Sequence, residues 1–141
     1  MNPYQAYRKN SDQSTGWTRI ELLLALFDKA LLRLDQAETE LRAGETMRAV
    51  PLIAKAQLAV STLSGGVRAG PGNELGVNML RLYEFVVREL SEPKVEKIES
   101  ARNVLKTLRQ GFEAIRAEAN ALERSGQLQS GDRLHQVHVT A

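Results

Sequence analysis

The sequence predicts an all-α protein, an antiparallel up-down-up-down four-helix bundle with an N-terminal arm and a disordered C-terminal tail. Apolar residues recur at the three- and four-residue spacing of one helical face, no segment alternates as a strand does, and the connections between apolar segments are short. The 141 residues fit a single domain. We expect the arm over residues 1–17, the bundle over 18–125 and the tail over 126–141.

The first helix is expected over residues 18–43. Thr18 and Glu21 form the T-x-x-E pattern of a capping box, in which the two side chains satisfy backbone amides at the helix start. Gly44 suits the left-handed conformation that follows a helix end. The second helix, over residues 46–64, contains Pro51, which either lies in its first turn or kinks it.

Two further helices complete the bundle. The glycine-rich segment 64–72 is expected to be a loop, and Asn73 is placed to cap a third helix over residues 73–91. The fourth helix is expected over residues 93–124, with Pro93 in its first position. Because it is the longest, its C-terminal end is expected to project beyond the others.

The composition argues against several classes of protein. Nineteen basic and seventeen acidic residues give a net charge of +2, and both signs are mixed along every helix, which is not typical of nucleic-acid binding. The chain has no cysteine. Its apolar run Ile20–Phe27 is too short to span a bilayer, and the polar N-terminus lacks a signal peptide. We therefore expect a cytoplasmic protein that does not insert into membranes.

Catalytic and metal-binding patterns are also missing. The histidines His135 and His138 lie three residues apart in the expected tail, without a third ligand on rigid structure. Glu38, Glu40 and Glu45 lack the Glu-x-x-His partner used in di-iron bundles. We expect no enzyme activity, no cofactor and no metal.

The helices have more apolar surface than one core-facing stripe requires. In the first helix Leu22 and Leu26 lie beside the main stripe, and in the third Val77, Leu80 and Val87 do so. Two interpretations stay open: these helices are buried on more than one side, or they form a groove that accepts an amphipathic helix of a partner.

Several segments resemble one family. Residues 78–85, N-M-L-R-L-Y-E-F, are similar to the N-L-x-x-L-Y-x-Y signature of FliS-type flagellar chaperones, and residues 21–28, E-L-L-L-A-L-F-D, to the family's E-L-x-x-x-L-Y-D/E stretch. Residues 53–57 resemble the family's I/L-x-K-A-Q/x stretch, and residues 108–112 resemble its L-R-x-x-W ending, with Phe112 in place of Trp. Tyr7 fits the aromatic residue of the family's N-terminal arm. The resemblance covers about residues 4–115, in order and at matching spacing.

The resemblance implies a cytosolic export chaperone that binds the disordered C-terminal segment of flagellin in apolar grooves, prevents premature polymerisation and aids flagellar type III secretion. The flagellar export gate and a second copy of the chain are further candidate partners. The alternative is a non-enzymatic helical adaptor or regulatory bundle that acts by helix–helix association. The residues expected to contact flagellin are Tyr7, Leu22, Leu26, Ala56, Ala59, Leu63, Val77, Asn78, Tyr83 and Val86.

Overall fold

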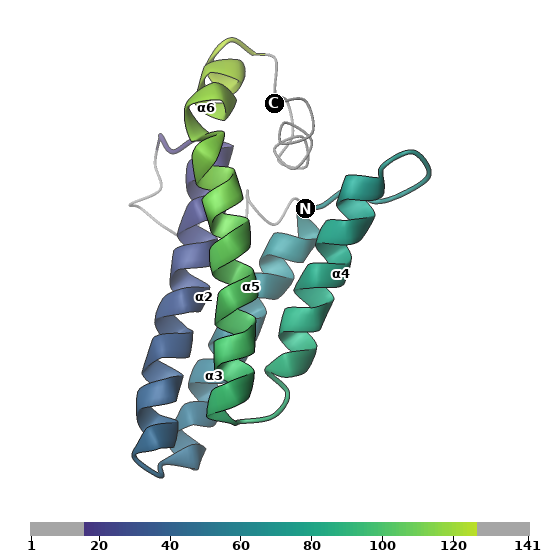
Figure 1. Cartoon of the computed structure of the whole chain (residues 1–141). Helices are drawn as coiled ribbons and strands as arrows, with labels where there is room; N and C mark the ends of the chain where they lie inside the picture. Colours follow the sequence, from purple (N-terminus) through teal and green to yellow (C-terminus); the bar gives the residue numbers. More distant parts are fainter. Residues whose placement is uncertain (1–15, 127–141) are drawn as a thin grey trace.

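The computed structural model describes residues 16–126, which form helices and connecting turns without a β-strand (Figure 1). This confirms the all-α class, and the arrangement is consistent with an antiparallel bundle. α2 packs most extensively on α3 and also on α5, while α4 lies against α3 and α5. The helices are α2 (Arg19–Arg42), α3 (Thr46–Gly65), α4 (Glu74–Glu89), α5 (Val95–Ala114) and α6 (Arg116–Arg124).

The core forms because each long helix turns one apolar face inward. At its centre the Phe27 ring of α2 lies 6.3 Å from the Tyr83 ring of α4 and 5.8 Å from the Phe112 ring of α5, measured between centroids. Aromatic pairs at these separations contribute about 0.5–1.5 kcal/mol beyond their area burial. Leu34 and Leu105 are also fully buried. One aromatic cluster therefore joins three of the helices.

The ends of α2, α3 and α4 fall within two residues of the expected positions. Gly44 follows the end of α2 with a φ of 77°, as expected for a residue in the left-handed region. Pro51 lies in the second turn of α3, so it does not start that helix. Its missing amide leaves the carbonyl of Met47 without the usual i+4 donor, and the exposure of both residues lets water take that place.

The start of α4 depends on a close approach between backbone segments. The side chain of Asn73 caps the helix as expected, accepting a hydrogen bond from the Gly76 amide at 3.0 Å, and it donates to the Arg68 carbonyl at 2.7 Å. A Cβ atom on Gly76 would lie only 2.0 Å from that carbonyl oxygen. Only glycine therefore lets the loop before α4 fold back onto its first turn.

The expected capping box of α2 is wrong. The Thr18 hydroxyl makes no capping bond within its own helix and instead donates to the side-chain oxygen of Asn120 in α6. The Glu123 carboxylate of α6 accepts the Arg19 amide, at 3.1 and 3.3 Å from its two oxygens. A carboxylate from a distant helix therefore satisfies the first amide of α2, whereas the pattern expected Glu21 to accept the Thr18 amide.

The expected fourth helix is two helices. α5 ends at Ala114, the chain leaves helical geometry at Ile115 (φ −103°, ψ 6°), and α6 begins at Arg116. Pro93 lies just before the N-cap residue of α5 instead of in its first turn. Figure 1 shows α6 beyond the ends of α3 and α4, as expected for a projecting end. Its base is not free, however, because Ala119 is fully buried and α6 contacts α2.

Candidate partner-binding grooves

An apolar groove lies between α4 and α5, and we call it the α4–α5 groove. It has a volume of about 370 Å³. Figure 1 shows α4 leaning away from α5 toward the loop that precedes it. Of the α4 side chains on this flank, Leu82 and the nearby Phe85 stay 38% and 39% exposed. The groove is lined by Leu75, Asn78, Met79, Leu82, Thr107, Leu108, Gly111 and Phe112.

The groove exists because α4 has a second apolar row beside its core-facing row. Met79 and Tyr83 are buried in the core, and Met79 also reaches the groove. Leu75 and Leu82, two helical turns apart, lie on a neighbouring row that lines the groove with α5. Gly111 on α5 has no side chain to fill the space between the helices. Apolar surface that two helices could have buried against each other is therefore left open.

The opposite end of this helix pair is held closed. Glu89 of α4 accepts hydrogen bonds from Lys97 Nζ at 3.1 Å and from the Ser100 hydroxyl at 3.0 Å, both on α5. Both hydrogen bonds lower the pKa of Glu89, and the bond from Lys97 has the larger effect. The helices are therefore tied together near the α4–α5 connection and part toward the other end.

Asn78 is the side-chain amide of the α4–α5 groove. It is exposed, and no hydrogen bond joins it to another residue within 16–126. A carboxamide has both donors and an acceptor, so it can bond to the backbone of a bound peptide. It would fix the register of a ligand that otherwise makes apolar contacts.

A second groove lies between α2 and α3, and we call it the α2–α3 groove. It has a volume of about 400 Å³. Its floor is apolar, but basic side chains surround that floor and no acidic residue lines it. The lining residues are Leu26, Lys29, Arg33, Lys55, Leu58, Ala59 and Thr62.

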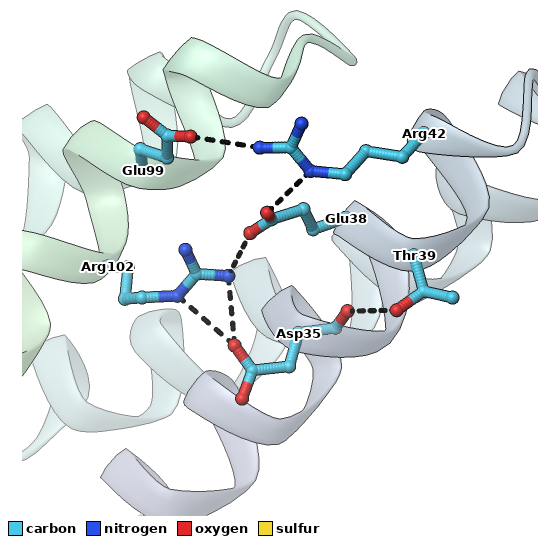
Figure 2. Close-up of polar contacts among 6 residues, drawn as sticks. All are labelled: Asp35, Glu38, Thr39, Arg42, Glu99 and Arg102. Carbon is cyan, nitrogen blue, oxygen red and sulfur yellow. Dashed lines mark hydrogen bonds and ion pairs between the residues drawn. The ribbon is translucent and has the colours of Figure 1, made fainter.

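Ion pairs close most of the flank between α2 and α5 (Figure 2). Arg102 Nη2 lies 2.5 Å from Glu38 and 2.9 Å from Asp35, and Arg42 lies 2.8 Å from Glu38 and 3.3 Å from Glu99. Hydrogen bonds from Arg42 and then Arg102 lower the pKa of Glu38. Because charged side chains bridge the helices here, this part of the flank offers no apolar groove.

A smaller and more polar pocket of about 290 Å³ lies on the same flank near the start of α2, beside Trp17. Arg109 of α5 pairs with Asp28 of α2 at 2.6 Å, and this bond raises the pKa of Arg109. The two acidic and two basic side chains of its lining give the pocket no single charge preference.

The structure places the expected contact residues in different environments. Two of them, Leu26 and Ala59, lie at the floor of the α2–α3 groove, and Asn78 lines the α4–α5 groove. Val77 is half-buried, and Tyr7 lies outside the described residues. Seven of the ten residues are at most 4% exposed, namely Leu22, Leu26, Ala56, Ala59, Leu63, Tyr83 and Val86. Most of the expected contact residues are therefore core residues in this structure.

Sequence reasoning did not assign the residues that give the α4–α5 groove its walls. Leu75, Leu82, Leu108 and Phe112 line the groove, and none of them is among the ten expected contact residues. The available signal was the seven-residue spacing of Leu75 and Leu82 with Asn78 between them, which marks a row distinct from that of Met79 and Tyr83.

Within residues 16–126 no group of three or more His, Cys, Asp or Glu side chains is placed to hold a metal ion. His135 and His138 lie outside that range. No helix in the same range is both long and apolar enough to cross a bilayer.

In a comparison with protein-family models, residues 1–119 match the family described as flagellar protein FliS. Comparisons with curated proteins and with solved structures return no match. The matched range contains both grooves and ends within α6.

Proposed function

Because the chain belongs to the flagellar protein FliS family of export chaperones, we propose that its cargo is the C-terminal segment of flagellin, held in the α4–α5 groove. The observation that supports this placement is an open apolar groove beside exposed Leu82 and Phe85. A chaperone of this kind needs a surface that covers the apolar face of a bound helix and later releases that helix. The family consists of chaperones and not of enzymes, and the proposed action requires no catalysis.

The groove suits an amphipathic helix that folds as it binds. Leu75, Asn78, Leu82 and Phe85 follow one another at three- and four-residue steps along α4, so their side chains form one continuous row. A helix lying in the groove would place its own i, i+3, i+4 and i+7 apolar residues against this row. Ordering a disordered segment costs about 2–5 kcal/mol of the gross interaction, which keeps the complex releasable.

We propose that cargo release precedes secretion at the flagellar export gate and that the complex forms in the cytoplasm. In this proposal Asn78, which lines the α4–α5 groove, contacts the bound flagellin segment. For the buried residues the proposed role is indirect: Tyr83 and Val86 fix the side of α4 that faces the core, and thereby the direction in which Leu82 points. The covering role of Tyr7 stays a prediction, since that residue lies outside the described range.

The test measures binding of a labelled flagellin C-terminal peptide to the purified chain and to a Leu82→Ala variant. Burying a whole leucine contributes about 1.5–3 kcal/mol. Leu82 is 38% exposed. Covering this exposed part with the peptide contributes roughly 0.6–1.1 kcal/mol. We therefore expect the Kd to rise about three- to sixfold. Leu82→Asp should reduce binding further, because the carboxylate would lose water.

Met47→Ala is the matched control. Met47 is 84% exposed and lies on α3, which does not line the α4–α5 groove, so its loss should leave peptide binding within about twofold. Wild-type affinity in a folded Leu82→Asp variant would refute the groove placement. Equal retention of full-length flagellin and of flagellin without its C-terminal segment would refute the cargo.

A further inference from the structure

The α2–α3 groove continues onto an apolar stripe along the outer face of α3. Leu58, at the edge of the groove, is 68% exposed, and Met47, three helical turns away, is 84% exposed. Pro51 and Ala54 lie between them on the same face and are exposed as well. Large apolar side chains this open, aligned beside a groove, form the kind of surface that a helix of at least three turns can cover.

The charge around this surface has one sign. Lys29, Arg33 and Lys55 line the groove, and no acidic side chain does. Within residues 16–126 neither Arg33 nor Lys55 forms an ion pair, in contrast to Arg42, Arg102 and Arg109 on the α2–α5 flank. The Arg33 guanidinium donates to Gln36 at 3.0 Å, but its buried Nε has no described acceptor.

These features identify the occupant by its chemistry. We propose that the α2–α3 groove and the adjoining stripe, Leu58 to Met47, are the docking site for an acidic amphipathic helix of a second partner protein. Carboxylates beside the apolar stripe of such a helix would meet Arg33 and Lys55, while its apolar residues cover Leu58. The flank differs from the one proposed for flagellin, so both ligands can be bound at once.

Charge favours an acidic helix of a partner protein over two alternative occupants, the α3 helix of a second copy and the terminal segments of this chain. A second copy would bring an α3 with Arg48 and Lys55 but no acidic residue between Thr46 and Gly65. The terminal segments are not acidic either: residues 127–141 contain one aspartate and one arginine, and residues 1–15 contain two basic residues and one aspartate. Neither the α3 of a second copy nor the terminal segments therefore supply a row of carboxylates for the basic rim.

The experiment uses two fluorescent helical peptides of about 20 residues that share one leucine stripe and differ only in their flanking residues, glutamate in one and lysine in the other. Anisotropy titration of the full chain should show binding of the glutamate peptide, weakened by salt. Lys55→Glu should weaken it about fivefold or more, since an attraction becomes a repulsion. Leu58→Ser should also weaken it.

Lys106→Glu provides the matched charge reversal, because Lys106 is exposed on α5 and lines neither groove. We expect it to change the affinity less than twofold, and a flagellin C-terminal peptide at saturation should not displace the glutamate peptide. Equal binding of both peptides, equal effects of the two charge reversals, or displacement by the flagellin peptide would each overturn the proposal. So would a dimer in solution that Leu58→Ser converts to monomer.

Discussion

The contact between α6 and the start of α2 can be tested through one carboxylate. Glu123 accepts the Arg19 amide at 3.1 Å, and its Oε1 lies 3.5 Å from Arg19 Nε. Glu123→Ala removes both interactions and leaves the first amide of α2 without its acceptor. If α6 stabilises the bundle through this cap, the free energy of unfolding falls.

The size of the loss follows from the two parts of the contact. Losing an N-terminal cap costs about 0.5–2 kcal/mol, and an ion pair with this exposure contributes about 0.2–1 kcal/mol. The side chains of Arg19 and Glu123 are 17% and 21% exposed, which favours the upper part of the second range. We expect Glu123→Ala to lower the free energy of unfolding by about 1–2.5 kcal/mol. Glu123→Gln keeps an oxygen acceptor and should lose about half as much.

The assay is urea unfolding followed by far-UV circular dichroism, with the free energy extrapolated to water. Glu118→Ala is the control, since Glu118 is exposed on the same helix and loses the same atoms. Equal losses for Glu118→Ala and Glu123→Ala would assign the effect to α6 helicity and refute the cap. A Glu123→Gln variant as unstable as Glu123→Ala would show that the retained acceptor contributes nothing.

Two further predictions concern the loop before α4 and the α2–α5 ion pairs. Gly76→Ala should destabilise the protein by about 1–3 kcal/mol in the same urea assay, because the added Cβ meets the Arg68 carbonyl; a more stable variant would contradict this close approach. Hydrogen bonds from Arg42 and Arg102 lower the pKa of Glu38 below its ordinary value of 4.5, so their stabilisation is present above that value and is lost as the pH falls through the lowered pKa. Wild-type stability should therefore decrease more than that of Glu38→Gln between about pH 5 and 3, and parallel pH profiles would contradict it.

Periodicity predicted the helices well because burial of one face leaves a regular trace in the sequence. It could not decide which surplus apolar residues are buried. Leu22 and Leu82 both belong to broad apolar surfaces, yet Leu22 is 1% exposed and Leu82 is 38% exposed. The difference arises from the neighbours: α2 is covered by both α3 and α5, whereas α4 and α5 part at one end. That arrangement depends on how α2, α3, α4 and α5 pack together, and no single segment encodes it.

Local patterns were reliable where the interacting groups are close in sequence. Asn73 caps α4 as expected because its partner, the Gly76 amide, lies three residues away. Thr18 and Glu21 have the same short spacing, yet Thr18 bonds to Asn120 instead. The partner of the Thr18 hydroxyl lies on a distant helix, and pattern reasoning over a few residues has no access to it.

The cap on α2 also relates the bundle to the order in which the chain is made. Arg19 and Glu123 are 104 positions apart, so at synthesis rates of about 5–20 residues per second the acceptor is added roughly 5–20 s after the amide it binds. During translation α2 is the first of the described helices to be made, and the last to receive its cap. Closing so long a loop is entropically costly and comes late in folding. On a nascent chain, the first turn of α2 would therefore gain this stabilising hydrogen bond only after α6 had been translated.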